Sequence, residues 1–179
     1  MEIREETAGD HEAVRSVHEL AFGDSGPKVA DLNDALRETR DALSLVAVDD
    51  GQVVGHVMFT SSLLDAPREL VRVPVLSPVG VLPERHGQGI GSALIRRGLE
   101  ILDERGEPLV FLEGHPGFYA KLGFKAAGEL GFRKPSLRIP DVAFQVYLLA
   151  AYQDWMTGTL VYSQAFWDHD SVGLRDPDA

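Results

Sequence analysis

The chain has 179 residues, of which 44% are hydrophobic and 25% charged, a composition typical of a folded protein with an ordinary core. It contains no cysteine, which excludes a disulfide scaffold, a thiolate zinc site and a cysteine nucleophile. The net charge of −11 argues against general affinity for nucleic acid or an anionic membrane surface. The acidic residues 1–10 lack the pattern of a signal peptide, and no apolar run is long enough to span a membrane, so we expect a cytoplasmic protein.

The N-terminal segment predicts a strand followed by two helices. Thr7 and Asp10 form a capping signal for a helix that continues to about Phe22, after a short strand over residues 2–6. Beyond a loop, apolar residues recur at helical spacing and predict a second helix over residues 29–39.

Three β-rich runs follow and predict an antiparallel meander. The Asp50-Gly51 pair between the first two runs is a strong hairpin signal. Pro74 and Pro78 in the third run lack an N–H donor, so we expect a bulge or an unpaired edge there. The predicted strands cover residues 43–48, 52–63 and 71–82.

The rest of the chain alternates between helix and strand. We predict a glycine-rich turn at 86–91, a helix to about 105, a strand at 108–113, a short helix at 116–122, a strand after Gly123-Phe124, a loop at 129–141 and a final strand at 142–149. The C-terminal segment is rich in aromatic residues, which we assign to core or homodimer packing, with a substrate wall as the alternative.

Gly87, Gly89 and Gly91 lie where the glycine-rich turn becomes a helix. Glycine permits positive φ and a close approach of a ligand to the backbone, and the first helical turn offers unpaired N–H groups at the positive end of the helix dipole. This pattern predicts an anion site, most simply for a phosphate or pyrophosphate. The alternative is a helix entry that needs glycine only for packing.

Two other phosphate-binding motifs compare less well with the chain. The Gly-Lys-Ser or Gly-Lys-Thr of a P-loop is absent. A dinucleotide-binding fold would explain Glu113, an acidic residue at the end of the next predicted strand, roughly 20 residues after the glycines. In that fold, however, the first glycine follows its strand at once within a parallel unit, whereas here residues 83–86 intervene and an antiparallel meander comes before.

The order of elements over residues 2–150 and the motif His86-Gly-Gln-Gly-Ile-Gly91 resemble the GNAT superfamily of acetyl-CoA-dependent N-acetyltransferases. Residues 118–124 resemble the fourth-helix motif of that family, and residues 114–119 resemble one of its bacterial subgroups. His86 departs from the family pattern, which has Gln or Arg at this position.

The resemblance implies an α/β fold of the α+β type, with a mixed, mostly antiparallel central sheet flanked by helices. It implies a single domain over residues 1–170, followed by a flexible tail at 171–179. The strand before the motif would hold the pantetheine arm, and backbone N–H groups would hold the pyrophosphate. The implied cofactor-binding residues are Val79, Val81, His86, Gly87, Gln88, Gly89, Ile90, Gly91 and Ser92.

Tyr119 matches the family's tyrosine near the thioester sulfur, where a phenol can protonate the departing thiolate; the alternative is an aromatic that only packs the short helix. The implied mechanism is direct attack of an amine on acetyl-CoA in a ternary complex. Glu113 and His115 are candidates for the base, but neither is assigned.

The six histidines lack the spacing of a zinc site, so we expect no metal.

We therefore expect an N-acetyltransferase that uses acetyl-CoA as cosubstrate and acts on a primary amine of a small molecule or peptide. A non-catalytic acyl-CoA-binding or regulatory module is the alternative, and a dinucleotide-binding protein is a third. Residues 51–150 hold 11 of the 17 basic residues, so the acidity lies at the two ends of the chain. That distribution favours a cationic acceptor.

Overall fold

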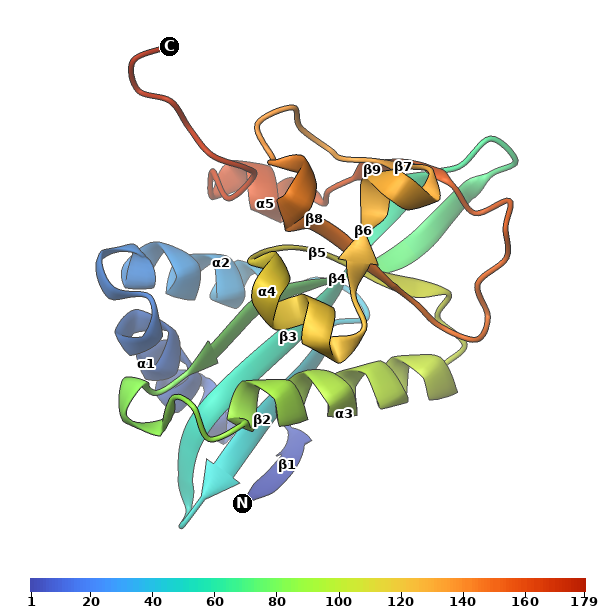
Figure 1. The fold of residues 1–179 in the computed structure, drawn as a ribbon. Coiled ribbons are helices and arrows are strands. Elements are labelled where there is room, and N and C mark those ends of the chain that lie inside the picture. Colours follow the sequence, from blue (N-terminus) through green and yellow to red (C-terminus); the bar gives the residue numbers. More distant parts are fainter. The chain divides into compact units, whose positions relative to one another are not determined.

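The two long strands of the structure are β3 (Gln52–Asp65) and β4 (Leu70–Val81) (Figure 1). The chain divides into two units, and each of these strands contributes to both. The computed structural model describes residues 1–179. The first unit comprises Met1–Thr60 and Leu76–Glu104, and the second comprises Ser61–Val75 and Arg105–Ala179. None of the helices combines the length and the apolar character needed to cross a membrane.

The first unit contains the predicted strand, helices and antiparallel meander. Its other elements are β1 (Glu2–Glu5), α1 (His11–Ala21), α2 (Gly26–Arg37), β2 (Leu43–Asp49) and α3 (Ile90–Glu104), with 3-10 turns at Ala8–Asp10, Gly23–Ser25 and Pro83–Arg85. The strands pair in the order β1-β2-β3-β4, and β1 and β3 are both antiparallel to β2. The predicted hairpin is confirmed, since Asp49 pairs with Gln52 and both Asp50 and Gly51 have positive φ.

Helices α1 and α3 cover opposite faces of β3, because successive strand residues point to opposite sides. A Cβ atom at Gly55 would lie 3.0 Å from Ile90 and 3.1 Å from Leu94, both on α3. The next residue, His56, instead contacts His18 of α1. Helix α2 packs against α1. The first unit therefore has three layers, with the strands in the middle.

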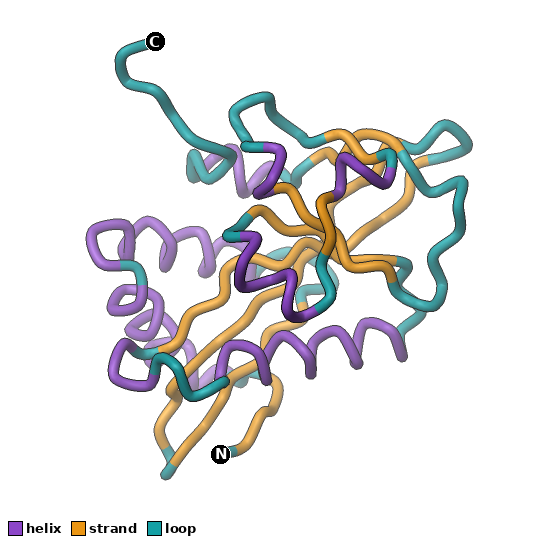
Figure 2. Tube along the Cα trace, in the orientation of Figure 1, coloured by secondary structure: helices purple, strands orange, loops and turns teal.

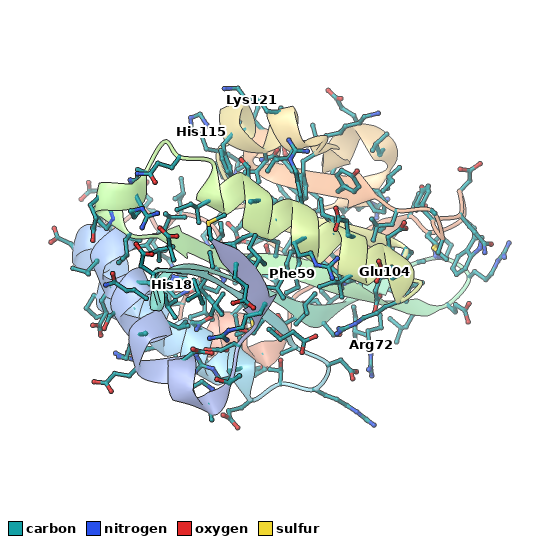
Figure 3. The ribbon with its side chains drawn as sticks, turned by 90° about the horizontal axis from the view of Figure 1, so that it is seen from below. His18, Phe59, Arg72, Glu104, His115 and Lys121 are labelled. Atoms are coloured by element: carbon teal, nitrogen blue, oxygen red, sulfur yellow. The ribbon has the colours of Figure 1, made fainter.

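Two histidines lie in the core of the first unit. His18 (labelled in Figure 3) and His56 are both fully buried, and His18 Nε2 lies 2.8 Å from His56 Nδ1. Burial lowers the pKa of His18 from 6.5 to about 4, and it lowers the pKa of His56 well below 6.5. Both imidazoles are therefore neutral in the folded protein at neutral pH.

Because these pKa values are lowered by folding, we expect stability to fall as the pH drops from 6.5 toward 4. In this range the unfolded chain binds protons that the folded protein does not. For His18 alone, the free energy of unfolding should fall by about 2 kcal/mol between about pH 7.5 and about pH 5. Urea denaturation at the two pH values measures this loss. The variant His18→Gln should show a smaller loss, and an equal free energy of unfolding for the wild type at both pH values would contradict the prediction.

The second unit carries the remaining strands on the C-terminal half of β3 and the N-terminal half of β4. Its elements are β5 (Leu109–Glu113), α4 (Pro116–Tyr119), β6 (Lys125–Ala126), β7 (Phe132–Arg133), β8 (Phe144–Leu148), β9 (Gly158–Val161) and α5 (Gln164–Asp168), with 3-10 turns at Ala120–Leu122, Ala127–Leu130 and Asp141–Ala143. Strand β8 is antiparallel to β5 and β6, and β9 is antiparallel to β3. Pairing is parallel between β4 and β5 and between β7 and β9.

Strand β4 shows the weak pairing that its two prolines predict. It lies between β3 and β5 in the strand order, so it is not an edge strand. Its pairing with β5, however, is restricted to one position, Val75 with Phe111. The sheet is otherwise mostly antiparallel, as the fold prediction required.

The prediction for residues 129–149 was wrong in part. The predicted loop contains β7, and the strand at 144–148 is followed by a loop (Figure 2), by β9 and by the helix α5. Strand β7 has only two residues and α5 has five, so neither is long enough to show a hydrophobic period. Phe132, Tyr162 and Phe166 are buried, so these aromatic residues pack the core of the second unit.

Candidate functional site

The glycine-rich turn of the first unit is an exposed loop that leads directly into α3. Gly87 has φ +77° and Gly89 has φ +78°, and a Cβ at either position would contact nothing within 4 Å. These glycines are therefore required by backbone conformation and not by packing. At these two positions close packing therefore does not explain the glycine, while the binding role of the motif stays a prediction.

The loop and the first turn of α3 present a row of free backbone donors. Ala93 N donates to Gly89 O at 3.0 Å and begins the helical hydrogen bonds. The N–H groups before it make no hydrogen bond to the backbone; they belong to Gly87, Gln88, Gly89, Ile90, Gly91 and Ser92. Free donors at the positive end of a 15-residue helix fit a phosphate or pyrophosphate without needing a cationic side chain.

Side chains on both sides of the loop hold it in place. Arg85 Nη2 donates to Asp49 at 2.6 Å, and Arg85 Nε donates to the Gln88 side chain at 3.0 Å. His86 Nε2 lies 2.8 Å from Val81 O and so binds back to β4. The histidine that replaces the family's Gln or Arg therefore connects the loop to its preceding strand.

The end of β4 leads into this loop from the interior of the first unit. Val79 and Val81 are half-buried, and Leu82 N donates to Val54 O of β3 at 2.9 Å. Gly80, between the two valines, is buried against α1, because a Cβ there would lie 2.8 Å from His18 Nδ1.

Tyr119 belongs to the second unit, at the end of α4. Its ring packs edge-on against Phe118 and Phe124, with centroids 4.9 and 5.7 Å away. Gly114 makes room for the ring, since a Cβ at Gly114 would lie 2.6 Å from Tyr119 Cε2. Burial raises the pKa of Tyr119 to about 12, so the phenol keeps its proton at any working pH.

The two acid–base candidates on the same unit have structural partners. Glu113 accepts hydrogen bonds from Tyr162 Oη and from Gly173 N, both at 3.1 Å, and burial raises the pKa of its carboxyl. His115, labelled in Figure 3, is exposed and accepts a hydrogen bond from Gly117 N at 3.2 Å, so it caps α4. Both contacts give these residues a role in holding the chain.

Glu113 also connects to the segment that the sequence predicts as a tail. Glu113 binds Gly173 N in this segment. The neighbouring residue Val172 is buried, and its carbonyl accepts a hydrogen bond from Arg138. The first residues of the segment 171–179 thus have specific contacts, while the flexibility of its end stays a prediction.

The proposed cofactor residues therefore all lie in the first unit, whereas Tyr119, Glu113 and His115 lie in the second. Residues 2–127 match the family model described as acetyltransferase (GNAT) domain. The chain belongs to this family. The match confirms the family resemblance that the glycine motif and the order of elements predicted, and it identifies the protein as an acyltransferase.

Relatives and solved structures agree with this assignment. The chain is 39% identical over 130 residues to the uncharacterized N-acetyltransferase YjhQ of Escherichia coli strain K12. This alignment covers 70% of this chain and 71% of YjhQ. The crystal structure of the E. coli GNAT family N-acetyltransferase YhbS in complex with CoA has a TM-score of 0.84 at 30% identity and covers 97% of this chain and 95% of that one. A GNAT family acetyltransferase from Brucella melitensis in complex with acetyl-CoA has a TM-score of 0.73 at 36% identity, over 92% of this chain and 97% of that one.

Sequence reasoning missed one polar cluster in the first unit. It connects His18 and His56 to Ser44, Glu6 and Arg37 by side-chain hydrogen bonds. These residues are widely separated along the chain, and no spacing of theirs forms a motif. The structure contains no group of three or more His, Asp or Glu residues placed to hold a metal ion.

Proposed function

We propose that this GNAT protein transfers an acetyl group from acetyl-CoA to a primary amine of a small molecule or a peptide, and that it does so in the cytoplasm. The observation that carries the proposal is the row of free N–H groups at the start of α3, held by glycines at positive φ. Such a row suits a pyrophosphate. YhbS and the Brucella melitensis protein, whose structures contain CoA and acetyl-CoA, support the same cosubstrate here.

In this proposal the pyrophosphate is bound by backbone N–H groups, and the pantetheine arm lies along the end of β4. Val79 and Val81 would supply the strand contacts, in the manner of an added β-strand. His86 would fix the loop through Val81 O, to which it already binds. The residues proposed for the loop itself are Gly87, Gln88, Gly89, Ile90, Gly91 and Ser92.

The chemical step would be direct attack of the neutral amine nitrogen on the thioester carbonyl in a ternary complex. The chain has no cysteine to carry a covalent acetyl group. The C–N bond forms, the C–S bond breaks and the thiolate takes up a proton. Tyr119 is the proposed donor, because its phenol is protonated at neutral pH and can donate a hydrogen bond or a proton to the departing thiolate.

We expect Tyr119→Phe to lower kcat by about 100-fold, because the variant lacks the proton donor for the thiolate. The affinity for acetyl-CoA should change little, since the ring and its packing remain. Rates follow from the release of free CoA thiol, and affinity follows from calorimetry. Tyr152→Phe, which removes a hydroxyl elsewhere in the second unit, is the matched control. An undiminished rate in Tyr119→Phe would exclude the residue from the mechanism.

The function itself is tested with acetyl-CoA and a panel of amines: spermidine, kanamycin and a short peptide with a free N-terminus. The acidic ends of the chain favour cationic acceptors such as these. Thiol release that depends on one of the amines supports the transferase. Tight acetyl-CoA binding without thiol release for any amine would favour a non-catalytic acyl-CoA-binding module. Thermal stabilisation by NADH but not by CoA would overturn both.

A further inference from the structure

A continuous chain of hydrogen-bonded side chains crosses the first unit from β1 to α1. Glu6, just after β1, accepts a hydrogen bond from Ser44 Oγ of β2 at 2.6 Å. Ser44 Oγ lies 2.8 Å from His56 Nε2, and His56 Nδ1 lies 2.8 Å from His18 Nε2. Glu6 is also paired with Arg37 of α2, whose Nη2 lies 2.7 Å from Glu6 Oε1.

The Glu6 carboxylate, at the charged end of this series of hydrogen bonds, determines the tautomer of each histidine. The Glu6 carboxylate, paired with Arg37, can only accept, so the Ser44 hydroxyl donates to it. Ser44 Oγ must then accept from His56 Nε2–H, which leaves His56 Nδ1 without a proton. His56 Nδ1 accordingly accepts from His18 Nε2–H. Since a neutral imidazole carries one proton, His18 Nδ1 has a free lone pair.

That lone pair is at the end of the series of hydrogen bonds from Glu6 to His18, and it has no partner. His18 is fully buried, and its Nδ1 makes no hydrogen bond. It faces Gly80 of β4, in the strand proposed for the pantetheine arm, where a Cβ would lie 2.8 Å away. The ring of Phe22, at the end of α1, lies 5.9 Å from the His18 ring and is 37% exposed. A Cβ at Gly80 would also lie 3.4 Å from Phe22 Cε2, so the partly exposed ring of Phe22 lies beside the position that the lone pair faces.

Leaving an imidazole nitrogen buried and unpaired lowers the stability of the folded protein. A hydrogen bond with a substrate would remove that cost. We propose that His18 Nδ1 accepts the proton of the acceptor amine when Phe22 moves aside, and that His56, Ser44 and Glu6 form a proton relay behind it. The proposal rests on the proposed acetyl transfer and assigns the base for that reaction.

The step is balanced in atoms and charge. As the amine nitrogen bonds to the carbonyl carbon it becomes acidic and loses one proton to His18 Nδ1, while the departing thiolate gains one. The Nε2 proton of His18 shifts to His56, the proton of His56 shifts to Ser44, and the hydroxyl proton of Ser44 shifts to Glu6. After product release, Glu6 gives its extra proton to solvent, Tyr119, which protonated the thiolate, takes one proton up from solvent, and the starting tautomers are restored.

The groups around the histidines keep them in the accepting form. Burial is the main cause of the low pKa of His18; Arg37 lowers it further, and Asp34 raises it. For His56, burial acts first, followed by His18 and Arg37. The residues that face the pair from α2, β2 and β4 are Arg37, Asp34, Ser44 and Gly80. We therefore expect kcat to show no loss between about pH 8 and about pH 5 that is due to protonation of the base.

The tautomers can be tested in the free protein, without any reaction. In protein with 15N-labelled imidazoles, NMR should show both His18 and His56 as Nε2–H tautomers at neutral pH. His18→Gln keeps a donor near the Nε2 position but has no nitrogen at Nδ1, so His56 should keep its tautomer in this variant. Finding His18 as the Nδ1–H tautomer in the wild type would overturn the relay.

The base role is tested by kinetics with an amine that the wild type acetylates. We expect His18→Gln to lower kcat by about 100-fold with an unchanged Kd for acetyl-CoA. His11→Gln, on the exposed start of α1, is the matched control and should keep the wild-type rate. Ser44→Ala should lower kcat by about tenfold, and Ser44→Thr, which restores a hydroxyl, should recover it. A folded His18→Gln with the wild-type rate would overturn the base role alone, whereas a wild type inactive on every amine would overturn the transferase and the relay together.

Discussion

Replacing Gly89 by valine should weaken acetyl-CoA binding by about 100-fold, equivalent to about 2.7 kcal/mol. At φ +78° a β-branched residue is strained, so the loop of the variant should leave the conformation that presents its N–H groups. Several free donors lie next to Gly89, and each hydrogen bond to a charged phosphate contributes about 1.5–3 kcal/mol. Losing one or two of them accounts for the expected effect. Isothermal titration calorimetry with CoA measures it.

Gly106 provides a control with nearly the same backbone strain. It has φ +79°, a Cβ there would also contact nothing within 4 Å, and it follows α3 instead of preceding it. Gly106→Val should therefore lose a similar amount of folding stability but bind CoA as the wild type does. If both variants lost affinity equally, or if neither did, the binding site would not be the loop at the start of α3.

Replacing Gly98 by alanine should destabilise the first unit by about 2 kcal/mol, although alanine is the better helix former by about 1 kcal/mol. Gly98 lies in the middle of α3 and is buried against the ring of Phe59, which is 1% exposed. A Cβ at Gly98 would overlap Phe59 Cε2 and Cζ. Because the ring is fully buried in the core, relieving the overlap requires the ring or the backbone of α3 to shift. Urea denaturation followed by circular dichroism measures the loss.

A double variant separates this overlap from any other effect of the alanine. Gly98→Ala with Phe59→Leu should be more stable than the sum of the two single changes predicts, because the smaller side chain makes room for the methyl group. Gly128→Ala is the control, since a Cβ at Gly128 meets nothing within 4 Å. Strict additivity of Gly98→Ala and Phe59→Leu would show that contact with Phe59 is not the cause.

Much of the fold could be predicted from the sequence because its main signals are local. The Asp50-Gly51 turn, the capping box at Thr7 and the apolar face of α3 each depend on residues within a few positions of one another. The short elements after residue 129 could not be predicted. Strand β7, for example, exists because its residues Phe132 and Arg133 pair with Gly158 and Thr159, a contact between distant segments.

The glycine motif divides in the same way. The sequence by itself predicts an anion site at Gly87, Gly89 and Gly91, because backbone freedom at glycine and free donors in a first helical turn are local properties of that segment. The positive φ of Gly87 and Gly89 agrees with that prediction. Only the structure shows what the side chain of His86 contacts, because its hydrogen bond to Val81 O depends on how the loop folds back onto β4. Glu113 is a candidate base by its position near the end of a predicted strand. Only the structure shows that its carboxylate accepts hydrogen bonds from Tyr162 and Gly173.

The histidines are the clearest case of what the sequence leaves undetermined. Along the chain, His18 and His56 are 38 residues apart, and neither belongs to a motif that would mark it as functional. Folding packs α1 against β3, brings the two rings within 2.8 Å of each other and connects them through Ser44 to Glu6. The sequence alone determined the family and predicts the phosphate-binding loop, because both depend on neighbouring residues. Only the tertiary structure decided which buried nitrogen is left with a free lone pair, because that depends on hydrogen bonds between four separate elements.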